Sequence, residues 1–160
     1  MQSETNTSRA ESIVAWYTLA AATTGAIPVP AASAAIVAEN GAMISHIASS
    51  MGIPISVGTV LESVGMMGVA NMVGRQLFIE GAKLLSWGTG SVWALAGLSA
   101  LGAGTAGLQT YIIGRLGIEI AKNGGQCLSS LKSAKVIADS KNTYDTFVKD
   151  WSSRTISKPI

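Results

Sequence analysis

One long uncharged stretch, residues 84–114, constrains this chain more than any other feature. It contains no acidic or basic side chain, and Arg115 follows it directly. A helix needs about 20 apolar residues to cross a bilayer, so this stretch is long enough. Trp87 and Trp93 lie near one end and Tyr111 near the other, as aromatic residues do at the two membrane interfaces. The stretch therefore predicts a membrane-spanning helix, and the alternative is a central helix buried in a soluble all-α domain.

The same stretch is rich in small residues that recur every four positions. In lipid, helices associate where small side chains let two backbones approach closely. The pattern predicts a helix–helix seam, within one chain or between copies, although low bulk inside a crowded bundle explains the spacing equally well. The packing positions are Ala96, Ala100 and Gly104 on one face, with Gly102 and Gly107 on adjacent faces.

Composition points to the same class of protein. Charged residues make up 12% of the 160 residues, about half of the ~25% usual in globular domains, and mean hydropathy is +0.40. The net charge of +2 is uneven, because residues 1–125 carry −1 and residues 126–160 carry +3. This basic excess is too small and too local for a nucleic-acid-binding surface. With one cysteine and one histidine, the chain offers no zinc cluster, so we expect no metal and no cofactor.

Helix signals and prolines divide the chain. Residues 1–8 read as a polar N-terminal tail, and Ser8 with Glu11 fits a capping box that starts a helix at Arg9. Proline lacks a backbone donor and disfavours helical geometry in the residue before it, so we expect breaks at Pro28, Pro30 and Pro54. The expected helices cover residues 9–26, 31–51, 55–85 and from a turn at 87–90 to about 122, which makes residues 9–125 a membrane-associated helical domain.

The last segment, residues 126–160, has a different character. Apolar residues recur there at spacings of mostly three, four or seven, and lysines and aspartates fall largely between them. This pattern predicts an amphipathic helix. A basic amphipathic helix beside a membrane commonly lies on anionic lipid, and packing on the parent bundle or on a partner is the open alternative.

Three segments resemble a known bacterial family. They are TGAIPVP at 24–30, ISHIASSMGI at 44–53 and IGRLGI at 113–118. In this order they resemble the G-x-I-P-x-P, M-I-x-x-I-A-x-x-Y-G-I and R-L-G-I segments of the YcjF-like family of unknown function. That family is membrane-associated and is often fused to, or encoded beside, small GTPases of the Era or Ras type. The resemblance therefore implies a membrane-anchoring or GTPase-partner module, although this chain carries no GTPase domain.

Polar side chains inside the expected spans are the candidates for chemistry. A charge at the bilayer centre costs about 2.5–3.5 kcal/mol on insertion scales, so carboxylates there are expected to be protonated, paired or hydrated. The hypothesis is a polar core that conducts an ion or a proton. The alternatives are a structural hydrogen-bond network, or helices that lie at the surface. The candidates are Glu39, His46, Glu62, Asn71 and Arg75.

Catalytic motifs are missing from the sequence. It has no phosphate-binding G-x-x-x-x-G-K-[ST] loop and no complete nucleophile elbow. We therefore expect a protein that is not an enzyme and has no catalytic residues.

Three architectures stay open at this stage. Four helices span the membrane with both termini in the cytoplasm, or only the first and fourth insert, or the chain is a compact soluble helical oligomer. The favoured interpretation is an all-α membrane bundle in the bacterial cytoplasmic membrane, or in an internal membrane derived from it. Its expected job is a self-assembling scaffold or membrane-recruitment module, whose partners are the bilayer, further copies and a small GTPase. The alternative function is a small ion or proton channel or carrier.

Overall fold

The computed structural model describes residues 2–27, 32–60, 62–63 and 92–152, and every regular element among them is helical. Its long helices are α1 (Gln2–Gly25), α2 (Ala32–Met51), α4 (Val92–Lys122) and α5 (Ser130–Ser152). Residues 57–60 add a short helical segment. The all-α class predicted from the sequence is confirmed. The predicted turn at 87–90, Pro28, Pro30 and most of the predicted helix 55–85 lie outside the described residues.

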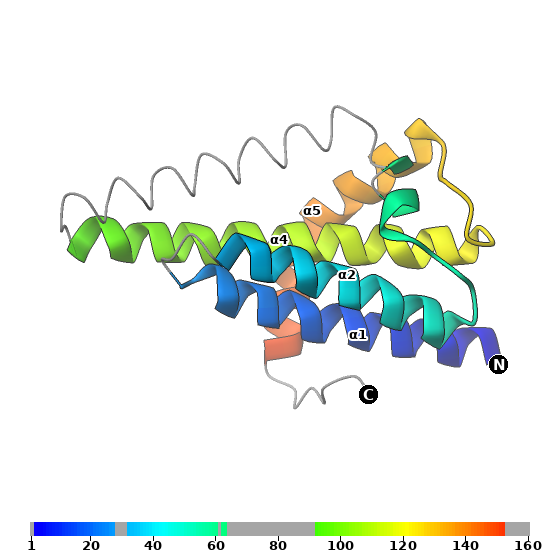
Figure 1. Ribbon diagram of the computed structural model, residues 1–160, viewed down its shortest axis with the longest axis horizontal. Coiled ribbons are helices and arrows are strands. Elements are labelled where there is room, and N and C mark those ends of the chain that lie inside the picture. The colour runs from blue at the N-terminus through cyan, green and yellow to red at the C-terminus, as the bar shows by residue number, and fades with distance from the viewer. Residues whose placement is uncertain (1, 28–31, 61, 64–91, 153–160) are drawn as a thin grey trace.

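Helix α4 is the axis along which the other helices pack. Helices α1 and α2 lie beside it, and α5 crosses it obliquely (Figure 1). The backbone of α4 meets α1 in antiparallel order, because Gly107 lies near Ala22 and Gly114 lies near Val14. The beginning of α1 therefore lies beside the end of α4, as the ribbon colours in Figure 1 also show.

Two glycines let α4 approach its neighbours closely. A Cβ added at Gly114 would lie 2.6 Å from a methyl group of Val14 on α1 and 3.2 Å from the sulfur of Met43 on α2. A Cβ at Gly117 would lie 2.9 Å from the end of the Ile44 side chain. Glycine is therefore required here to bring both helices against α4, as small residues do in close-packed helix pairs.

The apolar core surrounds this close approach. Large aliphatic side chains from α1, α2 and α4 lose almost all contact with water there, and each contributes roughly 1.5–3 kcal/mol on burial. The largest fully buried apolar residues are Met43, Ile44, Ile47, Leu116, Ile118, Ile120, Val14 and Val60. Most of them lie toward the end of the bundle at which α1 begins and α4 ends.

The start of α1 differs from the sequence prediction. Helix α1 begins at Gln2 and not at Arg9, and Ser8 lies inside the helix, where its carbonyl oxygen accepts a hydrogen bond of 3.1 Å from the Ser12 hydroxyl. The predicted cap at Ser8 is therefore wrong. Polar residues without proline or glycine can continue a helix, and Glu4 in the first turn interacts favourably with the positive helix end.

Glycines end two of the helices and bring two loops together. Gly52 has φ +67° directly after α2, and Gly124 and Gly125 have φ +70° and +81° after α4. These left-handed conformations cost glycine little. A Cβ at Gly125 would lie 2.6 Å from the carbonyl oxygen of Pro54, so the two loops pack against each other. The buried backbone N–H of Leu128 donates to the Ser63 hydroxyl at 3.0 Å and extends this contact.

Candidate functional site

The charges of α1 and α4 gather at one end of the bundle. In α1 they are Glu4, Arg9 and Glu11, all in its first half, and in α4 they are Arg115, Glu119 and Lys122, all in its last third. Because the two helices are antiparallel, both groups lie at the same end. Toward the other end, α1 after Glu11 and α4 from Val92 to Gly114 carry no charge at all. We call this second part the charge-free end.

Helix α2 differs, because its single charged residue, Glu39, lies toward the charge-free end of α1 and α4. The Thr24 hydroxyl of α1 donates a hydrogen bond of 2.9 Å to Glu39 Oε1, so this carboxylate faces α1. From Ala35 to Met51, the exposed residues of α2 are small or apolar, and Val37 exposes 72% of its surface. The other exposed positions are Ala35, Ala38, Ala42, Ser45 and Ser49.

Helix α5 crosses the bundle where the charged part meets the charge-free end. The ring of Phe147 lies 4.3 Å from that of Tyr111 on α4, and the Tyr111 hydroxyl lies 3.2 Å from the Thr143 hydroxyl. Tyr144 contacts the backbone of α4 at Gly107. The predicted amphipathic helix is therefore present, its aromatic face packs on the bundle, and its charged residues are exposed. These are Lys132, Lys135, Asp139, Lys141, Asp145, Lys149 and Asp150.

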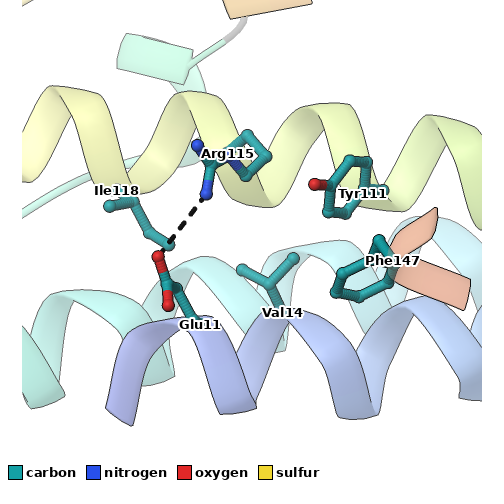
Figure 2. Close-up of a pocket in the computed structure, with 6 residues that line it drawn as sticks. All are labelled: Glu11, Val14, Tyr111, Arg115, Ile118 and Phe147. Carbon is teal, nitrogen blue, oxygen red and sulfur yellow. Dashed lines mark ion pairs between the residues drawn. The ribbon is translucent and has the colours of Figure 1, made fainter. Parts of the chain in front are cut away.

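A cleft opens at this same boundary between α1, α4 and α5 (Figure 2). It encloses about 160 Å³. Arg115 Nη1 lies 3.6 Å from Glu11 Oε1 across its mouth, and the two side chains are 37% and 47% exposed. The remaining wall is apolar or aromatic. The residues that line it are Glu11, Val14, Tyr111, Arg115, Ile118 and Phe147.

A second polar contact joins α1 to α2 one heptad away from Glu39. The Tyr17 hydroxyl and His46 Nδ1 lie 3.0 Å apart, and the two rings are 5.7 Å apart. Tyr17 is buried, and burial followed by the nearby Glu39 charge raises the pKa of its hydroxyl. Glu39 and His46 both face α1, as their seven-residue spacing indicates. Glu39 Oε2 is buried without a hydrogen-bond partner among the described residues.

Glu62 lies elsewhere, beside the loop that follows α4. Its Oε2 accepts a hydrogen bond of 3.1 Å from the exposed Cys127 thiol. This hydrogen bond, together with burial and the Glu62 charge, raises the pKa of the Cys127 thiol. Glu39 contacts Thr24 at the end of α1, and Glu62 contacts Cys127 just after the end of α4. Because α1 and α4 are antiparallel, these two helix ends lie at opposite ends of the pair. The structure therefore does not bring Glu39 and Glu62 into one polar core. Asn71 and Arg75 lie outside the described residues.

The predicted packing positions of α4 have different surroundings. Gly107 is buried against Ala22 and Tyr144, whereas Gly104 is exposed and an added Cβ there would meet nothing within 4 Å. The side-chain surroundings of Ala96, Ala100 and Gly102 lie outside the described residues. Sequence reasoning missed Gly114 and Gly117 as contact positions. The signal was available, because five small residues of α4, all of them buried, follow alternating steps of three and four: Gly107, Thr110, Gly114, Gly117 and Ala121.

Two further findings concern metal ions and membranes. Among residues 2–27, 32–60, 62–63 and 92–152, no group of three or more histidine, cysteine or acidic side chains is placed to hold a metal ion. No helix in this described part has both the length and the hydropathy that a membrane span requires. In comparisons with known proteins, no family model, curated protein or solved structure matches this chain.

Proposed function

We propose that this chain is a non-enzymatic, membrane-associated helical protein that embeds the charge-free end of its bundle in a bilayer. The observation that carries the proposal is the separation of charge along α1 and α4, together with the partly buried position of Glu39, the one charged residue of α2, against Thr24 of α1. A single charge costs about 2.5–3.5 kcal/mol at the bilayer centre, so a helical end without exposed charge is suited to lipid. In α4 this end extends from Val92 to Gly114, about 34 Å of helix at roughly 1.5 Å per residue.

The orientation of the embedded end follows from the antiparallel helices. The start of α1 and the end of α4 stay in water together, and α5 lies at the boundary with its lysines exposed. Amphipathic helices with lysine on the polar face bind at the lipid headgroups, so α5 contributes a second attachment. Burial of Tyr111 and Phe147 against each other holds α5 at that level.

As a membrane-bound protein without catalytic motifs, the chain is proposed to act as a self-assembling scaffold or recruitment module. The uncharged outer face of α2 and its small residues suit close packing with a second copy within lipid. The resemblance to the YcjF-like family supports the bacterial cytoplasmic membrane as the location and a small GTPase as a partner. Capture of partners from membranes with and without non-hydrolysable GTP tests the GTPase part separately.

Vesicle binding tests the embedded end. Gly104→Lys and Val37→Lys each place a charge on an exposed position of the charge-free end without disturbing the core. Gln126→Lys adds the same charge at an exposed position near the other end. We expect the first two variants to lose about tenfold or more in vesicle affinity, because each inserted lysine costs about 2.5 kcal/mol, and the third to keep it. Equal binding by all three, or no binding of vesicles by the parent chain, contradicts the proposal.

A further inference from the structure

The cleft at the boundary of the charge-free end combines two kinds of surface. Val14, Ile118 and the rings of Tyr111 and Phe147 form an apolar wall, and Arg115 and Glu11 place opposite charges side by side across its mouth (Figure 2). The cleft is open on one side and has a volume of about 160 Å³. The space therefore suits a small polar headgroup next to an apolar tail, and not a large cofactor.

The ion pair at the mouth is open to a ligand. The distance of 3.6 Å between Arg115 and Glu11 is longer than the 2.9 Å between Lys122 and Glu119 on the same helix. Both side chains of the first pair keep more than a third of their surface in contact with water. A guanidinium carries five N–H donors. The contact to Glu11 uses only Nη1 of Arg115, so other donors of this side chain are open to a ligand.

The position of the Arg115–Glu11 pair along the bundle determines which part of a bilayer it would contact. Arg115 is the first charged residue after the uncharged part of α4, and Glu11 is the last before the uncharged part of α1. In a bundle embedded by its charge-free end, this level lies at the lipid headgroups. A headgroup that carries a phosphate and an ammonium matches the pair charge for charge, with the phosphate on Arg115 and the ammonium on Glu11. In this arrangement each charge of the headgroup lies beside a side chain of opposite charge, and the Arg115–Glu11 pair stays intact.

We propose that this cleft binds the zwitterionic headgroup of an ethanolamine phospholipid, with its phosphate on Arg115, its ammonium on Glu11 and the start of its acyl chains against Val14 and Phe147. The site rests on the membrane association proposed above and names the lipid class that it recognises. A primary ammonium fits better than a quaternary one, because it donates hydrogen bonds to the Glu11 carboxylate.

The test is calorimetric titration of the whole chain with soluble short-chain phosphatidylethanolamine. Phosphatidylglycerol and phosphatidylcholine of the same chain length vary the headgroup, and glycerophosphoethanolamine lacks the chains. Arg115→Gln and Glu11→Gln each remove one charge of the cleft. Lys122→Gln and Glu119→Gln make the same charge changes in the other ion pair of α4 and serve as matched controls.

We expect Arg115→Gln and Glu11→Gln each to weaken ethanolamine-lipid binding about tenfold, as expected for loss of one charge-assisted contact, and the controls to change it less than about twofold. The paired loss is the signature, because a site for anions alone would bind more tightly after Glu11→Gln. The double variant Glu11→Arg with Arg115→Glu keeps the ion pair and reverses its polarity. We expect this double variant to fold, as measured by circular dichroism, and to lose binding of the ethanolamine lipid.

Several results overturn the assignment. These are no binding of the short-chain ethanolamine lipid, equal affinity for all three headgroups, or equal loss in the cleft variants and the controls. Binding of glycerophosphoethanolamine as tight as that of the lipid would overturn the lipid as the source of the headgroup. Vesicle sedimentation separates this failure from that of the proposed function. The vesicles consist of phosphatidylcholine with or without phosphatidylethanolamine. If the parent chain binds both equally, and Arg115→Gln does the same, membrane association stands and the cleft assignment falls.

Discussion

Thr24 on α1 donates a hydrogen bond of 2.9 Å to Glu39 on α2, so the only charged residue of α2 faces another helix and not the outside of the bundle. Seven residues earlier on α1 and seven later on α2, Tyr17 meets His46 at 3.0 Å. The two contacts repeat one antiparallel register. They fix how α1 and α2 align, and they leave the outer face of α2 without charge.

The first prediction concerns the half-buried contact between Thr24 and Glu39. Thr24→Val removes the donor and leaves the Glu39 carboxylate without it, so we expect a loss of about 1–3 kcal/mol in unfolding free energy. Glu39→Gln keeps an acceptor for Thr24 and removes the negative charge, but its amide NH₂ takes the place of the buried Oε2, which has no partner among the described residues, so we expect this change to be about neutral. Urea denaturation of the two variants checks both. A Thr24→Val variant as stable as the parent would show that the contact does not align the helices.

The second prediction concerns the close approach of α4 to α1 and α2 at Gly114. Gly114→Ala places a methyl group against Val14 and Met43, so we expect a loss of about 1–3 kcal/mol from overpacking. Gly104→Ala is the matched control on the same helix. Its position is open, so it should gain about 0.5–1 kcal/mol from helix propensity. The double variant Gly114→Ala with Val14→Ala relieves the contact and is expected to recover part of the loss. Identical melting temperatures for the two single variants would contradict the packing.

The third prediction concerns the stability of the protein at alkaline pH. Burial raises the pKa of Tyr17 and of Tyr144 above the value of about 10 that tyrosine has when unfolded. The folded protein therefore holds these protons more tightly than the unfolded chain. Their contribution to stability is complete below about pH 10 and is lost as the pH rises through the folded pKa values.

Denaturation curves between about pH 8 and 11.5 measure this loss of stability. Tyr17→Phe is expected to make the decline shallower, because one of the groups with a raised pKa no longer titrates, and the contributions of Tyr144 and Cys127 remain. A decline of the same steepness in this variant would exclude Tyr17 as a source.

The fourth prediction concerns the reactivity of the Cys127 thiol. Its hydrogen bond to Glu62 raises its pKa, so little thiolate forms near neutral pH. Glu62→Gln removes the negative charge, and we expect alkylation by a maleimide at about pH 8 to become severalfold faster. Glu11→Gln makes the same charge change away from the thiol and should leave the alkylation rate as in the parent. Equal rates in all three proteins would mean that the contact is absent in solution.

Local signals made part of the fold predictable. Periodicity and glycine placed the ends of α2 and α4 correctly, because a left-handed glycine after a helix acts through its own backbone. The start of α1 was missed, because a polar segment without a breaker can join a helix that the bundle holds in place. Of the candidate site, Glu39 and His46 were assigned to one face, but their partners Thr24 and Tyr17 were not found. The seven-residue spacing of both pairs was the available signal.

The helical class, the uncharged stretch at 84–114 and the amphipathic character of α5 follow from hydropathy and helix propensity, which are properties of residues that are neighbours along the chain. The antiparallel packing of α1 on α4 is visible only in the folded structure, and it brings Glu11 beside Arg115 and gathers the charges of both helices at one end. It also decided that Gly114 and Gly117 lie at the closest approach. The physical reason is that the choice of contacting faces depends on how side chains from distant parts of the chain fit together, and spacing along one helix does not contain that information.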